Sequence, residues 1–171
     1  SAITTSNYPQ TWGGDFTFTG TNNLNLGTGA VSMGASRTVT TSGGILTVGG
    51  IISGSSYNLT KAGTGVLIFS GANTYTGTTT ISNGTLALGA ANRISNSSNI
   101  ILSGGTFSTG TSTGYDETVG TLSLQSNSTI ALGIGSHILN FSASNGVSWT
   151  GSTVLTITGW TGTIGNCSAG T

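Results

Sequence analysis

Acid–base chemistry in this chain would depend on very few residues. Asp116 and Glu117 are adjacent carboxylates, and His137 is the single histidine. A glycosidase or polysaccharide lyase needs acids that converge on one face, whereas adjacent residues of a strand point to opposite faces. A hydrolytic triad would have to join His137 to Asp15, Asp116 or Glu117 across the fold. We therefore expect Asp116 and Glu117 to be solvated turn charges and His137 to be a surface or turn histidine, in a chain that is not an enzyme.

Patterns for cofactors and metal ions are equally sparse. Gly13-Gly14-Asp15 matches half of a calcium-binding Gly-Gly-x-Gly-x-Asp repeat, but it occurs once, whereas such sites need stacked copies. The glycine-rich stretches lack the Lys-Ser/Thr pair of a phosphate-binding loop. We expect no cofactor and no metal site.

Four residues are candidates for contacts with a ligand or with another chain: Trp12, Trp149, Trp160 and Cys167. Tryptophans form sugar platforms and assembly contacts. The alternative, which we favour, is packing in the end coils of the fold, because Trp12 and Trp160 lie near the two ends of the chain. Cys167 is the only cysteine, which fits neither a disulfide framework nor a zinc site. It is a free thiol, a partner for a cysteine outside this sequence, or an inert small residue.

The composition limits the classes of protein to which the chain can belong. Its 171 residues suit a single domain. They include 30 glycines and only 4% charged residues, against about 25% in an average globular protein. Three Lys and Arg balance three Asp and Glu, which excludes a cationic face for nucleic acid. No apolar run approaches the roughly 20 residues of a membrane span, and we expect that any signal peptide has been removed.

Short segments that alternate apolar and small polar residues indicate strands with one buried face. No window has the apolar spacing of a helix, and Gly, Asn and Ser separate the segments. The clearest alternating segments are 16–18, 24–26, 31–33, 46–48, 86–88, 122–124, 130–132, 139–141 and 155–157.

A degenerate repeat favours a β-solenoid over a sandwich or a barrel. The segment Gly-Thr-Leu-Ala-Leu-Gly at 84–89 is echoed by Gly-Thr-Leu-Ser-Leu at 120–124 and by Gly-Ile-Leu-Thr-Val-Gly at 44–49. Strand–turn units of this kind bury a face only against neighbouring coils. We predict an all-β chain that forms one parallel β-solenoid domain over residues 1–171. With about 20 residues per coil, it would make roughly eight coils and reach about 40 Å.

The best-formed repeat, residues 59–89, resembles the autotransporter-associated β-strand repeat of bacterial surface proteins. The elements that carry the resemblance are Lys61-Ala62-Gly63, the strand 66–69, the block Ser-Gly-Ala-Asn-Thr-Tyr-Thr-Gly at 70–77, the strand 78–82 and Gly84-Thr85-Leu86. The resemblance implies a right-handed parallel β-helix that is exported and lies on the surface of, or is shed from, a Gram-negative-type bacterium. It supplies no catalytic residue.

These observations lead to three functional hypotheses. The first is a structural subunit that assembles with copies of itself into an extracellular filament or surface layer, because the solenoid ends lack caps and the chain has few charges to block strand edges. The second is an adhesin or carbohydrate-binding surface module, with glycans or host cell surfaces as partners. The third is an ice-binding protein, which would need Thr-x-Thr at the same place on successive coils.

Overall fold

The structure, a computed structural model, describes residues 2–161. These residues contain strands and turns but no helix, so the described part includes no helical segment with the length and apolarity to cross a membrane. The strands are β1 (Ile3–Thr4), β2 (Gln10–Trp12), β3 (Phe16–Phe18), β4 (Leu24–Asn25), β5 (Val31–Met33), β6 (Arg37–Thr41), β7 (Ile45–Val48), β8 (Ile52–Ser53), β9 (Leu59–Ala62), β10 (Val66–Phe69), β11 (Thr79–Ile81), β12 (Thr85–Leu88), β13 (Ile100–Ser103), β14 (Thr106–Ser108), β15 (Glu117–Val119), β16 (Leu122–Ser126), β17 (Ser128–Ala131), β18 (Leu139–Phe141) and β19 (Leu155–Thr158).

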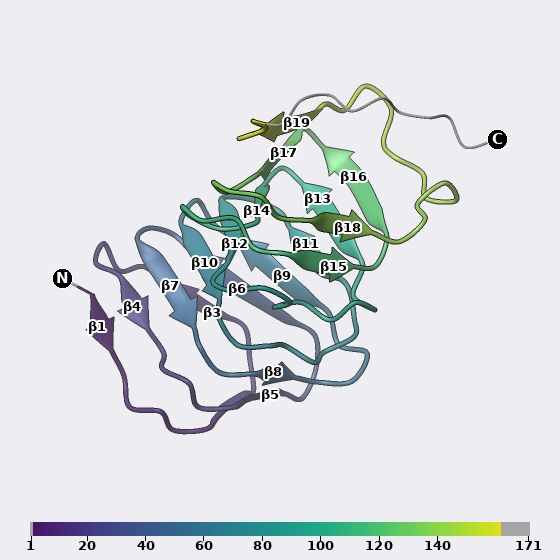
Figure 1. The fold of residues 1–171 in the computed structure, drawn as a ribbon. Coiled ribbons are helices and arrows are strands. Elements are labelled where there is room, and N and C mark those ends of the chain that lie inside the picture. Colours follow the sequence, from purple (N-terminus) through teal and green to yellow (C-terminus); the bar gives the residue numbers. More distant parts are fainter. Residues whose placement is uncertain (1, 162–171) are drawn as a thin grey trace.

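Successive coils supply the strands of each sheet. The largest sheet has the order β1-β4-β7-β10-β12-β14-β17-β19, and a second has the order β16-β13-β11-β9-β6-β3. Two smaller sheets pair β2-β5-β8 and β15-β18. The strand pairs are parallel, and Figure 1 shows the coils stacked from the N-terminus to the C-terminus. The chain is a parallel β-solenoid, as the alternating pattern predicts.

The coils are less uniform than the sequence suggests. Eight strands in the largest sheet correspond to seven turns of the chain, where an even 20-residue coil predicted about eight. The step between paired residues is 19 residues from Val66 to Thr85 and 27 residues from Ser128 to Leu155. The last step is long because residues 142–154 lie outside strands between β18 and β19. Coil length therefore varies, and the estimate of eight was wrong.

One row of apolar side chains runs through the whole largest sheet. We call it the central ladder, and its members pair in register from β1 to β19: Ile3, Leu24, Leu46, Leu67, Leu86, Phe107, Ile130 and Ile157. The members from Leu46 to Ile130 are at most 3% exposed. Like residues stack here because parallel strands without a slip place equal positions of successive coils one above another.

Side-chain carbonyl groups tie the turns of one coil to the next. In each case an Oδ1 atom accepts a backbone N–H from the following coil, at 2.7 to 3.1 Å. Buried or stacked turns need such partners for backbone groups that no strand pairs. The accepting residues are Asn7, Asp15, Asn23, Asn58, Asn99, Asp116 and Asn127.

Candidate functional site

The two adjacent carboxylates have different environments. Asp116 is exposed, and its Oδ1 accepts the backbone N–H of Ile138 at 2.7 Å. Glu117 begins β15 and is 1% exposed, so the expectation that it is a solvated turn charge was wrong. Its Oε2 accepts the backbone N–H groups of Arg93 at 2.7 Å and Ile94 at 3.3 Å. The carboxylates point apart, as adjacent strand residues must, and each binds backbone of a neighbouring coil.

Burial controls the charge of Glu117. Desolvation raises the pKa of its carboxyl to about 7, although the N–H groups of Arg93 and Ile94 and the positive charge of Arg93 act to lower it. Its second oxygen, Oε1, has no protein hydrogen-bond partner, and neither has Nδ2 of the nearby buried Asn73, whose backbone N–H donates to Arg93. Asn73, Arg93 and Glu117 form what we call the Glu117 cluster, a polar inclusion closed off from solvent.

Lys61 is the charged residue that sequence reasoning missed. It occupies an inward position of β9, in register between Val39 and Ile81, and is 0% exposed. Its Nζ donates to the backbone carbonyls of Ala62, Gly63 and Asn83 at 2.9, 2.7 and 3.0 Å. Burial lowers the pKa of Lys61 to about 8, while the three carbonyl acceptors favour the charged form. The ammonium group is therefore charged at neutral pH and joins the turns of two coils.

The other two cations bind backbone in the same way. Arg93 donates from Nη1 to the carbonyl of Ser70 at 2.8 Å and from Nε to that of Ala91 at 2.7 Å. Arg37 donates from Nε to the carbonyl of Trp12 at 2.7 Å. All three cations of the sequence thus hold backbone carbonyl groups, which leaves little positive charge at the surface for an acidic partner.

The polar block of the repeat is also used inside the fold. Tyr75 is 0% exposed, and its hydroxyl lies 2.7 Å from that of Thr79, which lies 3.0 Å from that of Ser98. The Ser98 hydroxyl donates to the carbonyl of Gly77 at 2.6 Å, so the proton order along the chain is fixed. Burial raises the pKa of Tyr75. The Tyr of the repeat is a structural residue with a satisfied hydroxyl.

His137 forms the single contact in the described chain that resembles catalytic machinery. It is half-buried, with Nδ1 2.8 Å from the carbonyl of Gly135 and Nε2 2.9 Å from Oγ1 of Thr109. The carbonyl requires a proton on Nδ1, so Nε2 accepts the threonine proton. However, Thr109 is 0% exposed and its oxygen also accepts the N–H of Gly133. A substrate cannot reach this hydroxyl, and no carboxylate orients the imidazole.

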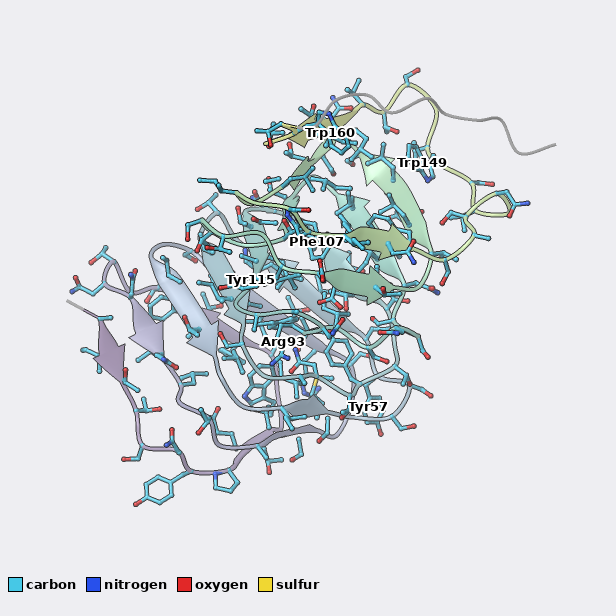
Figure 2. All side chains as sticks on the ribbon, in the orientation of Figure 1. Tyr57, Arg93, Phe107, Tyr115, Trp149 and Trp160 are labelled. Carbon is cyan, nitrogen blue, oxygen red and sulfur yellow. The ribbon has the colours of Figure 1, made fainter. Side chains whose placement is uncertain are left out.

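The three tryptophans occupy different environments. Trp12 is 6% exposed and packs edge-on against Phe16, with ring centroids 5.0 Å apart. Trp149 is 46% exposed, and its indole N–H donates to the carbonyl of Leu122 at 3.1 Å. Trp160 is 62% exposed, and Figure 2 shows Trp149 and Trp160 at the C-terminal end of the solenoid. Cys167 lies outside the described residues.

The largest hollow lies at that C-terminal end. This end groove has a volume of about 570 Å³ and is lined mainly by the apolar side chains of Leu132, Leu139, Phe141, Ile157 and Trp160, with His137 at its edge. It is the open cross-section of the solenoid core, where the rows of inward side chains end.

A second, smaller hollow lies on the outer face of the largest sheet. This side groove has a volume of about 350 Å³, and its lining includes the hydroxyl residues Thr85, Thr106, Ser108, Thr111 and Ser112. Thr85 and Thr106 alternate with the inward Leu86 and Phe107, so their side chains point away from the core. The side groove offers hydroxyl groups without any nearby charge.

Outward threonines form a row but not the array that ice binding needs. Thr85, Thr106, Thr129 and Thr156 follow one another in register over four coils. The positions two residues further along are Ala87, Ser108, Ala131 and Thr158. Among the paired strands of the described residues, no two successive coils carry Thr-x-Thr at matching positions.

Comparison with known proteins agrees with the resemblance in the repeat. Residues 59–88 match the family model of the passenger-associated-transport-repeat. Over 76 residues, 41% of this chain, the sequence is 43% identical to the adhesin BmaC autotransporter of Brucella suis biovar 1 (strain 1330). The match covers 2% of that relative's length, and no solved structure matches. Residues 59–88 are therefore a repeat of the autotransporter passenger type, carried within a β-solenoid.

Proposed function

We propose that this chain is a non-catalytic segment of a bacterial surface adhesin, in which the β-solenoid presents its outer faces to glycans or host cell surfaces. The observation that carries the proposal is the passenger-type repeat at 59–88, together with 43% identity over 76 residues to a protein named as an adhesin. Because the match covers so little of that relative, the proposal concerns a segment and not the activity of a whole adhesin.

The absence of catalysis is supported by how the chemical groups are used. Glu117 and Asp116 accept backbone N–H groups, and the Thr109 hydroxyl that His137 contacts is buried. General acid–base catalysis requires such groups to face a substrate. In the described residues these groups instead stabilise contacts between coils.

Adhesive contact is supported by the chemistry of the outer surface. The side groove combines hydroxyl groups of Thr85 and Thr106 with apolar neighbours such as Val66 and Ile134. Sugars present the same combination of hydroxyl groups and apolar ring faces. Hydroxyl-lined, uncharged grooves suit neutral glycans better than anionic ligands, because no cation is free to pair with an anion.

The test is an adhesion assay with purified chain coupled to inert beads. We expect beads that carry the chain to bind a neutral glycan array or epithelial cells above uncoated beads. A Thr85→Val/Thr106→Val variant, which keeps the side-chain shape but removes two hydroxyl groups of the side groove, should bind less. The matched control is Thr38→Val/Thr60→Val, a pair on the other large sheet. No binding by the unmodified chain would contradict the proposal, and equal loss in both variants would contradict the side groove as the contact.

A second candidate is the structural subunit of a filament or surface layer. It is supported by the sheet edges at both ends of the solenoid and by the 4% content of charged residues, because charge is a common means of blocking edge-to-edge association. Sedimentation of the purified chain tests it: large assemblies support this candidate, and a monomer at high concentration contradicts it.

A further inference from the structure

The central ladder is buried in its middle and exposed at both ends. Leu67, Leu86 and Phe107 are each 0% exposed, because a coil covers them on either side. Ile3 and Ile157 occupy the first and last positions of the same row and are 61% and 57% exposed. The row therefore ends with an isoleucine that lacks one neighbour at each end.

Each end also presents unpaired strand edges. β1 and β19 are the outer strands of the largest sheet, and β3 and β16 are the outer strands of the second sheet. The edge strands β1 and β19 contain only Ile, Leu and Thr, so they lack the charges that usually keep strand edges apart. Their free N–H and C=O groups can pair with another parallel strand.

Exposed apolar side chains are concentrated at these ends. The first coil contributes Ile3 and Tyr8, and the region after residue 133 contributes six more. Between them, the described residues have two exposed large apolar side chains, Ile51 and Tyr57. The six C-terminal residues are Ile134, Ile138, Trp149, Val154, Ile157 and Trp160. Clustered exposed apolar surface of this kind marks an interaction site.

We propose that the C-terminal face, formed by the edges of β19 and β16 and by the end groove, binds the N-terminal face of a second copy of this chain. Ile3 of one copy then stands over Ile157 of the other, and the central ladder continues across the contact. This inference rests on the second candidate function above and adds to it the surface, the partner face and the register.

The direction of the strands selects this pairing over the contact of two like faces. All strands of the largest sheet are parallel, and only an N-terminal face set on a C-terminal face continues a parallel sheet. Two C-terminal faces brought together by a two-fold axis would place their edge strands antiparallel. A head-to-tail contact uses two different faces, so it does not close after two copies and extends into a filament.

The experiment uses sedimentation velocity on the chain of 171 residues and on three single variants. Ile3→Lys and Ile157→Lys each place a charge at one end of the central ladder, and Ile51→Lys places the same charge on an exposed residue in the middle of the solenoid. We expect the unmodified chain and Ile51→Lys to form assemblies that grow with concentration. Each end variant should associate at least ~10-fold more weakly, because burial of an unpaired charge is unfavourable.

An equimolar mixture of the two end variants gives the decisive result. Ile3→Lys retains an intact C-terminal face and Ile157→Lys an intact N-terminal face, so the mixture should form dimers and nothing larger. Thermal melts by circular dichroism check that each variant is folded. A monomeric unmodified chain, a mixture that stays monomeric, or persistent self-association of either end variant alone would overturn the proposal.

The same proteins separate this proposal from the adhesin proposal. A chain that stays monomeric while its coated beads still bind cells overturns the end-to-end contact and leaves the adhesin proposal intact. A chain that assembles as described while its beads bind nothing supports the contact and contradicts the adhesin proposal.

Discussion

The central coils, β9 to β14, and the last coils, β17 to β19, carry the same alternating pattern with different consequences. In β12, Leu86 and Leu88 are at most 1% exposed. In β19, Leu155 and Ile157 have the same spacing, yet Ile157 is 57% exposed. Both strands pair in register with their predecessors, so the difference arises from the side where β19 has no neighbour.

The comparison shows that alternation in a solenoid predicts which way a side chain points, but not how far it is buried. Burial needs a coil on each side, because a repeat buries its apolar face only against its neighbours. The local stability of the molecule should therefore fall from the central coils toward β19. The predictions below test this gradient and the groups that support the central coils.

The largest effect should come from removing a central ladder side chain. Leu67→Ala takes away a fully buried group packed between Leu46 and Leu86, and should lower the free energy of unfolding by about 3 kcal/mol. Ile157→Ala should lower it by less than about 1 kcal/mol, because that side chain is already half exposed. Urea unfolding measures both. Equal losses at the two positions would mean that β19 is as well packed as β10, contrary to the gradient.

The next effect should come from Lys61. Lys61→Met keeps most of the side-chain volume but leaves the carbonyls of Ala62, Gly63 and Asn83 without their donor. Buried acceptors that lose a charged donor cost about 2 kcal/mol, which urea unfolding at pH 7 should show. The matched control is Arg93→Met, whose guanidinium holds carbonyls of a neighbouring turn and should behave alike. A Lys61→Met protein as stable as the parent would show that the central turns need no cation.

A smaller effect should distinguish two glycines in Asn-Gly turns. Gly84 has a φ of +61°, and a side chain there would meet the backbone carbonyls of Gly63 and Gly65 in the coil below. Gly84→Ala should cost about 1 to 2 kcal/mol. Gly146→Ala should be nearly neutral, because nothing lies within 4 Å of the added carbon. Thermal melts of the two variants make the comparison, and a Gly146→Ala protein that melts at the lower temperature would reverse it.

Sequence reasoning predicted the strands and the inward positions of residues such as Leu86 and Leu88, because these depend on neighbours within one strand. It failed for Lys61 and Glu117, which were not expected to be buried. Their partners are backbone groups about one coil away, such as the carbonyl of Asn83 and the N–H of Arg93. A charged residue at an inward position of an alternating strand, as Lys61 is, was the signal that the sequence offered.

The smallest effect concerns pH and the Glu117 cluster. Burial raises the pKa of Glu117 to about 7 in the folded chain, whereas an unfolded glutamate titrates near 4.3. The folded state holds the proton more tightly, so this stabilising contribution is complete below about pH 4.3 and is lost as the pH rises toward 7.

Between pH 5 and pH 6 the free energy of unfolding should therefore fall by about 1 kcal/mol, measured by urea unfolding at each pH. Glu117→Gln, which keeps the shape of the side chain but cannot titrate, should remove this slope. The carboxyl of Asp116 remains in both proteins and serves as the internal control for titration at the surface. If both proteins show the same slope, the Glu117 carboxylate is ionised within the solenoid at pH 5. The hydrogen bonds from Arg93 and Ile94 would then outweigh the cost of burying its charge.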